Sequence, residues 1–135
     1  MHPPGKRQTG ILIPAFSARR EGDLGIGDTL ALRQWIDWAS ETGVSFLQLL
    51  PINENGAEES PYSAISSAAL DPIYLSLDPT ELPWLTERDL ESARKRLGDS
   101  LHASWVDYPT VRAVKRNLLE LAWSNFQDTS GDFKK

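Results

Sequence analysis

The sequence contains no cysteine and only two histidines among its 135 residues. Without cysteine there is neither a disulfide framework nor a thiolate metal site, so nothing indicates an oxidising compartment and we expect a cytoplasmic protein. The histidines, His2 and His102, lie far apart and have no ligand-like spacing to acidic residues. A metal site is therefore not expected.

An excess of positive charge and long hydrophobic runs are also absent. The formal net charge is −5, and long-range repulsion would oppose binding to nucleic acid or to an anionic membrane surface. The apolar run at residues 11–13 is too short for a secretory signal or a membrane-spanning helix. The sequence therefore predicts a soluble protein whose ligand is neutral or cationic.

The amino-terminal third has the pattern of a strand, a helix and a second strand. Residues 10–14 form a short apolar run closed by proline, which favours a buried strand. Asp28 is a suitable N-cap for a helix over residues 29–42, and Gly43 is a typical left-handed stop. The apolar run at residues 44–50 follows directly as a second strand. A crossover of this kind makes the two strands parallel, so we predict an α/β fold.

The remainder of the chain is predicted to contain two more helices. Residues 73–77 form a short strand or an extended segment, a peripheral helix begins near residue 86 and ends at Gly98, and another helix covers residues 109–126. The apolar stripe of that last helix consists of Val111, Val114, Leu118, Leu121 and Ala122. Residues 79–107 look like an insertion, and nothing divides residues 1–135 into separate domains.

The segment from Ser60 to Pro72 has the character of a binding loop. It follows the second predicted strand and is too polar for a core, and parallel α/β folds place their sites after the carboxyl ends of strands. The nearby carboxylates are Glu58, Glu59 and Asp71, of which the glutamates belong to an acidic run typical of solvated surface. The loop contains no histidine for a Ser/His/Asp arrangement, so the motif alone does not predict catalysis.

Two other features have structural explanations that we prefer. Residues 22–28 look like a phosphate cradle, but no lysine follows and the glycine spacing is not that of a dinucleotide site, so a tight turn into a capped helix is the better interpretation. Five tryptophans could stack on sugars, yet Trp35 and Trp123 fall near helical stripes where core packing is expected. The sequence does not assign a role to Trp38, Trp84 or Trp105.

Several motifs occur in an order typical of one enzyme family. They are GILIP at 10–14, DLGIGD at 23–28, LQLLP at 47–51, SPY at 60–62, DP at 71–72 and VDY at 106–108, followed by Lys115 and Trp123. In this order they resemble the amino-terminal part of the 4-α-glucanotransferases, the amylomaltase or disproportionating enzyme family, and the similarity extends from Thr9 to Phe126. The resemblance implies a (β/α)8 TIM-type barrel that transfers α-1,4-glucan segments between maltooligosaccharides through a covalent glycosyl-enzyme intermediate, without a metal or organic cofactor.

The resemblance also implies a set of substrate-binding residues. Tyr62 matches the tyrosine of the family's SPY motif, whose ring lies against the donor sugar, and a phenol offers both an apolar face and a hydroxyl; a structural tyrosine is the alternative. Ser60 and Ser66 match serines that shape this pocket, and Asp71 stands where the family usually has asparagine. Many relatives carry a glycine-tyrosine pair for a remote glucan contact where this chain has Gly56-Ala57, so no secondary sugar site is expected there.

The family's catalytic carboxylates are expected to lie outside this sequence. They are an aspartate nucleophile, a glutamate acid/base and a transition-state-stabilising aspartate on later barrel strands. A (β/α)8 barrel takes about 250 residues, so we expect an incomplete barrel: an amino-terminal fragment with its first βα units, inactive and marginally stable alone. The alternative is a non-catalytic carbohydrate-binding or protein-interaction module that keeps the loop.

Overall fold

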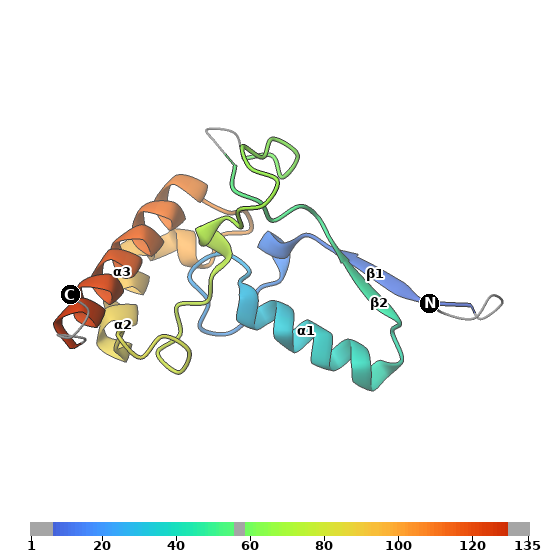
Figure 1. Cartoon of the computed structure of the whole chain (residues 1–135), viewed down its shortest axis with the longest axis horizontal. Coiled ribbons are helices and arrows are strands. Elements are labelled where there is room, and N and C mark those ends of the chain that lie inside the picture. Colours follow the sequence, from blue (N-terminus) through green and yellow to red (C-terminus); the bar gives the residue numbers. More distant parts are fainter. Residues whose placement is uncertain (1–6, 56–58, 130–135) are drawn as a thin grey trace, which may run out of the picture.

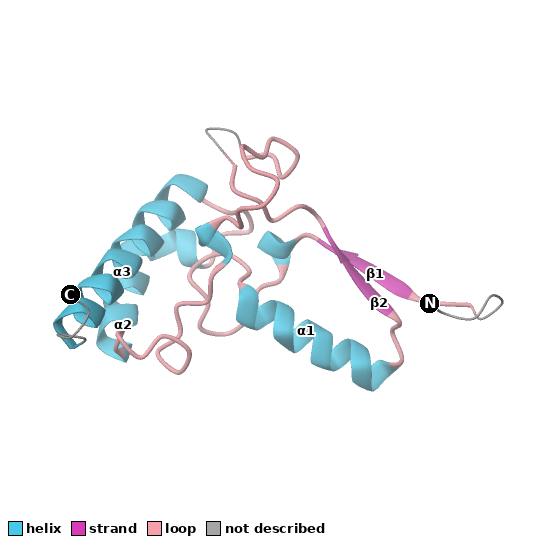
Figure 2. Cartoon of the chain, viewed as in Figure 1, coloured by secondary structure: helices cyan, strands magenta, loops and turns pink. Residues whose placement is uncertain are grey.

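A computed structural model describes residues 7–55 and 59–129. In these ranges two strands, three α-helices and three short 3-10 turns follow one another, namely β1 (Gly10–Ile13), η1 (Ala15–Ser17), α1 (Thr29–Thr42), β2 (Phe46–Leu49), η2 (Pro72–Tyr74), α2 (Glu87–Leu97), η3 (Gly98–Leu101) and α3 (Tyr108–Thr129). The strand pair with α1 beside it occupies one end of the molecule, and α2 and α3 pack together at the other (Figures 1 and 2). None of these helices has the length and hydrophobicity needed to cross a bilayer.

The unit formed by β1, α1 and β2 confirms the predicted parallel arrangement. Asp28 caps α1 by accepting a hydrogen bond from the Ala31 N–H at 2.9 Å, and Gly43 ends the helix with a φ of 76°. β1 pairs with β2 in parallel register, Ile11 opposite Leu47 and Ile13 opposite Leu49. Because the strands are parallel, their carboxyl ends lie at the same edge of the sheet. The loop that leaves this edge after β2 carries the predicted substrate-binding residues.

The two faces of the strand pair differ. Ile13 is buried in a small core with Ala18 and Ala31, and the side chains that pack around this core include Ile11, Trp35, Leu47 and Leu49. On the alternate positions, Leu12 is 54% exposed and Phe46 is 49% exposed. Within the described residues, the sheet is therefore covered on the α1 side only.

The main core lies between α2, α3 and the segments around η1 and η2. Leu90, Ala93 and Leu97 of α2 are each only 3% exposed and belong to this core. The prediction that this helix is peripheral is therefore wrong. The predicted bounds and apolar face of α2 agree with the structure, since Thr86 and Asp89 form a capping box and Gly98 follows the last turn.

Two further expectations need correction. Of the two alternatives for residues 73–77, the strand is wrong, because the Asp71 carboxylate accepts the Ile73 N–H at 3.0 Å and starts the 3-10 turn η2; the backbone becomes extended only from Leu75, after that turn. On α3, Val111, Val114, Leu118 and Ala122 are buried, but Leu121 is 37% exposed and Trp123 is 59% exposed. One helix packs against one side of α3, so the buried stripe is narrower than the sequence pattern.

Candidate functional site

The predicted binding loop leaves the carboxyl end of β2 and doubles back on itself (Figure 1). The Glu54 N–H donates to the Ala69 carbonyl at 2.9 Å, and the Ile65 N–H donates to the Glu54 carbonyl at 2.9 Å. At the base, the Asp71 N–H donates to the Ile52 carbonyl at 3.0 Å. These hydrogen bonds hold the two arms of the loop together and leave its tip in solvent.

A tight turn at the tip carries Tyr62. The Ser63 N–H donates to the Ser60 carbonyl at 3.0 Å, which closes a four-residue turn with Pro61 at its second position. The Ser60 hydroxyl oxygen accepts the Tyr62 N–H at 3.3 Å. Tyr62 is 75% exposed. Its ring is therefore available to a ligand, and the turn fixes the backbone that carries it.

Ser66 supports the returning arm of the loop. Its hydroxyl oxygen accepts the N–H groups of Ala68 at 3.2 Å and Ala69 at 3.0 Å. Like Ser60, it acts on the shape of the loop through backbone hydrogen bonds. Glu58 and the Gly56-Ala57 pair lie outside the described residues, whereas Glu59 is exposed at the start of the turn.

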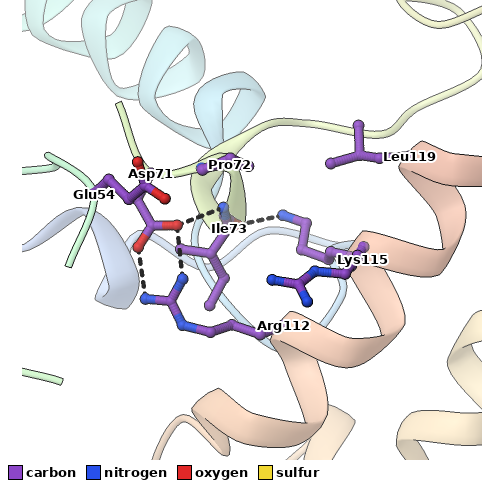
Figure 3. A pocket seen from close by; sticks show the side chains of 8 residues that line it. Glu54, Asp71, Pro72, Ile73, Arg112, Lys115 and Leu119 are labelled. Atoms are coloured by element: carbon purple, nitrogen blue, oxygen red, sulfur yellow. Dashed lines mark hydrogen bonds and ion pairs between the residues drawn. The ribbon is translucent and has the colours of Figure 1, made fainter. Parts of the chain in front are cut away.

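Asp71 is buried at the base of the loop. Its side chain is 1% exposed and forms a two-pronged ion pair with Arg112 of α3, with Nη1 at 2.8 Å and Nη2 at 2.6 Å (Figure 3). Hydrogen bonding to Asp71 raises the pKa of the Arg112 guanidinium. Together with the Ile73 N–H bond, these contacts direct the Asp71 carboxylate toward α3 and η2 and away from solvent.

A buried lysine lies beside this ion pair. The Lys115 ammonium is buried and donates to the Ile73 carbonyl at 2.6 Å. The side chains of Lys115 and Arg112 line a cavity of about 160 Å³ between η2 and α3 (Figure 3). Desolvation lowers the pKa of Lys115 to about 8, against the opposing effect of Asp28 and Asp23. Lys115 and Arg112 thus fix the base of the loop to one helix from two positions.

The glycine-rich segment of residues 22–28 forms a turn, as predicted. Gly22 and Gly25 have φ values of 79° and 82°. The Asp23 carboxylate accepts the N–H groups of Gly25 at 3.0 Å and Arg20 at 2.9 Å, and it pairs with Arg19 at 2.7 Å. Burial raises the pKa of Asp23, but these hydrogen bonds outweigh it and the net pKa is lowered. Two backbone N–H groups of this region thus bond to a carboxylate of the chain itself.

Arg20 makes the matching contact to the N-cap of α1. Its guanidinium pairs with the buried Asp28 carboxylate at 2.9 Å. Sequence reasoning identified Asp28 as a cap but missed the ion pairs of Asp28 with Arg20, of Asp23 with Arg19 and of Asp71 with Arg112. The Arg19–Asp23 pair has local i,i+4 spacing that could have indicated it. The Asp71–Arg112 partners are 41 positions apart in the chain, so no local signal marks that pair. His102 is exposed after η3, and His2 lies outside the described residues.

Comparison with known proteins gives one consistent family. The sequence matches the family profile described as 4-alpha-glucanotransferase over residues 13–135. The 4-alpha-glucanotransferase of Chlamydia caviae is 40% identical over 111 residues, which cover 82% of this chain and 21% of that protein. The chloroplastic/amyloplastic 4-alpha-glucanotransferase DPE1 of Arabidopsis thaliana is 31% identical over 134 residues, covering 98% of this chain and 22% of that protein.

A second plant relative extends the same result. The 4-alpha-glucanotransferase DPE2 of Oryza sativa subsp. japonica is 36% identical over 119 residues, which cover 83% of this chain and 12% of that protein. The chain spans about a fifth of the length of the relatives from Chlamydia caviae, Chlamydia trachomatis and Chlamydia muridarum. The family profile covers nearly the whole chain, and the chain belongs to the 4-alpha-glucanotransferase family.

Proposed function

We propose that this chain forms part of an enzyme that transfers α-1,4-glucan segments between maltooligosaccharides with retention of configuration. In this proposal β1, α1 and β2 are the first units of a (β/α)8 barrel, and the loop after β2 supplies one wall of the donor-sugar pocket. Family membership and the parallel β–α–β unit support it. The lack of cysteine in the sequence is the basis for placing the enzyme in the cytoplasm.

The exposure of Tyr62 is the observation that carries the proposal. A 75% exposed ring on a hydrogen-bonded loop gains free energy when a ligand or another part of the protein covers it. The loop leaves the carboxyl edge of parallel strands, where such folds bind substrates. A tyrosine there suits a pyranose ring, because the ring face packs on C–H groups and the hydroxyl forms hydrogen bonds.

The other predicted residues act on the pocket in two ways. We assign Ser60 and Ser66 to shaping the loop, since both hydroxyl oxygens accept backbone N–H groups within it. Asp71 anchors the loop to α3 through Arg112 and affects the sugar pocket by fixing the position of the loop. The substrate is thus expected to contact Tyr62 directly and Asp71 only through the position of the loop.

The chemistry itself requires groups beyond this loop. A retaining transfer needs a nucleophilic carboxylate and an acid/base carboxylate about 5 Å apart. Asp71 is committed to its ion pair with Arg112, so it is not available as either of these groups. We therefore expect no disproportionation of maltotriose by the 135-residue chain alone, and turnover by the purified chain would overturn this division of labour.

The role of Tyr62 can be measured in a complete enzyme. In the Chlamydia caviae relative, the matching segment is replaced by residues 13–129 of this chain, and glucose release from maltotriose is followed. Tyr62→Ala is expected to lower kcat/KM by about tenfold or more, because the stacking face is lost, whereas Tyr62→Phe keeps that face and loses less.

Ile65→Ala is the matched control for this experiment. Ile65 belongs to the same loop and is 68% exposed, so its removal tests whether any apolar side chain in the loop matters. The proposal requires Ile65→Ala to remain close to the parent enzyme. Equal and small effects of all three substitutions would remove Tyr62 from the donor pocket.

A further inference from the structure

A second concave surface lies at the same edge of the sheet as the Tyr62 loop. It is a cavity of about 310 Å³ between the turn that follows β1, with Phe16, Ser17 and Arg19, and the segment that precedes α3, residues 103–106. Because β1 and β2 are parallel, the turn after β1 and the loop after β2 leave the sheet at the same edge. The cavity is therefore on the side of the molecule where the donor pocket is proposed.

We propose that this cavity is an accessory subsite for a short α-1,4-glucan segment, with Trp105 as its stacking platform. The inference rests on the proposed glucan function and assigns it an additional binding site. It does not involve the Gly56-Ala57 position, where the sequence argued against a secondary contact.

The exposure of Trp105 is the first reason. Its side chain is 65% exposed, and it makes no ring pair with another aromatic residue in the described part of the chain, unlike Trp35 with Trp38 or Trp84 with Phe126. An indole offers the largest aromatic face of any side chain, and such a face packs favourably against the C–H groups of a sugar ring. The two residues before it, Ala103 and Ser104, have small side chains.

The polar groups around the cavity suit a neutral polyol. Arg19 uses Nε and Nη2 on Asp23, at 2.7 Å and 2.8 Å, and Nη2 also donates to the Leu101 carbonyl at 2.7 Å. Its charge is thus balanced by a buried carboxylate, while Nη1 bonds to no other described residue and can donate to a ligand. The Ser17 hydroxyl donates to the Pro14 carbonyl at 2.8 Å, which leaves its oxygen as an acceptor, and Ser104 adds an exposed hydroxyl.

The two walls of the cavity are held together before any ligand arrives. The bond from Arg19 to the Leu101 carbonyl joins residues 82 positions apart and ties the turn after β1 to the segment before α3. On the first wall, the Phe16 carbonyl accepts the Gly27 N–H at 3.0 Å. On the second, Ser100 donates to Asp107 at 2.8 Å. A site fixed in this way loses little entropy on binding.

The size of the cavity limits the ligand. About 310 Å³ is at the lower end of the range for small-molecule sites, so it accepts a short stretch of a glucan chain. The combination of an aromatic face, two hydroxyl oxygens and one guanidinium favours a sugar over an anion, since the charge of that guanidinium is already paired with Asp23.

The experiment is a titration of the 135-residue chain, labelled with ¹⁵N, with maltoheptaose, and with cellohexaose as the β-1,4-linked comparison. Maltoheptaose is expected to shift the amides of residues 16–19 and 103–106. Trp105→Ala should weaken this binding by about tenfold, and Trp105→Phe should retain most of it because a ring face remains. Trp123→Ala is the matched control, since Trp123 is 59% exposed on α3, and it should leave the affinity unchanged.

Each outcome separates the subsite from the donor pocket. Shifts confined to residues 59–71, or an affinity insensitive to Trp105→Ala, would overturn the subsite and leave the Tyr62 proposal intact. Shifts at residues 16–19 and 103–106 without any in the Tyr62 loop would support the subsite, and the assay in the complete enzyme would still decide the role of Tyr62. No shift with either sugar, or equal binding of cellohexaose, would overturn the α-glucan subsite, and the maltotriose assay would still decide the transferase proposal.

Discussion

Asp71 divides its carboxylate between Arg112 and the backbone of η2, and this makes it a sensitive position. Asp71→Asn keeps an oxygen for the Ile73 N–H but removes the charge that faces the guanidinium. We expect a loss of about 1 to 3 kcal/mol in the free energy of unfolding, below the value for a fully buried pair because Arg112 is about one-third exposed. Urea denaturation measures the loss, and amide exchange at residues 54, 65 and 71 should accelerate.

Arg33→Gln provides the comparison for this pair. Arg33 pairs with Glu81 at 2.7 Å, but its side chain is 65% exposed, so water screens the interaction. The change should alter the unfolding free energy by less than about 0.5 kcal/mol. If Asp71→Asn were equally mild, the anchoring role of Asp71 would have to be abandoned.

At the residue scale the sequence predicted local roles well and distant partners poorly. Asp28 and Gly43 were identified as caps because the groups they satisfy lie within four positions in the chain. Arg112 and Lys115 reach across from α3 to the base of the loop, 41 and 42 positions away. No short-range pattern encodes such a distance, so the burial of Asp71 was not foreseen.

Gly27 links the turn after β1 to the start of α1 by a close approach of two backbones. A Cβ at this position would lie against the carbonyl oxygens of Ala15 and Ala18, the latter at 2.6 Å. Gly27→Ala should therefore force the turn apart and destabilise the chain by about 3 kcal/mol, at the upper end of overpacking costs. Thermal unfolding followed by circular dichroism measures the change.

Gly43→Ala distinguishes this crowding from simple backbone strain. Gly43 has a φ of 76° but open space around the added methyl group, so its replacement should cost only about 1 kcal/mol. Equal losses of stability for Gly27→Ala and Gly43→Ala would mean that crowding between the turn after β1 and α1 adds nothing to the cost of the substitution. In that case the fixed first wall of the proposed subsite would lose its basis.

The elements themselves show where sequence patterns succeed. Helices α1, α2 and α3 were predicted close to their observed bounds, because caps and helical spacing act within each segment. Which faces they bury depends on neighbours, so the peripheral assignment of α2 and the inward placement of Trp123 were wrong. η2 was missed because one carboxylate contact decides between a strand and a turn.

On the scale of the whole molecule, part of the apolar surface is not covered by other elements. Leu12 and Phe46 of the strand pair are exposed, and a cavity of about 410 Å³ between α1 and β2, which Phe46 also lines, has mainly apolar side chains around it. Two strands alone also leave unpaired outer edges in the described ranges. In the proposed barrel these surfaces would be internal, which fits a chain that spans about a fifth of the length of its Chlamydia caviae relative.

The isolated chain is therefore expected to associate through this strand face. Sedimentation velocity at increasing concentration should show growth of species larger than the monomer, because apolar surface and free strand edges both favour contact between copies. Replacing Leu12 and Phe46 together by threonine keeps the strand propensity and removes apolar area, so it should shift the chain toward monomer. Trp123→Gln removes an exposed ring of α3 and should leave the association unchanged. If Trp123→Gln dissociated the larger species while the strand-face substitutions did not, the copies would associate through α3 and not through the open sheet. The incomplete-barrel explanation of the exposed face would then lose its support.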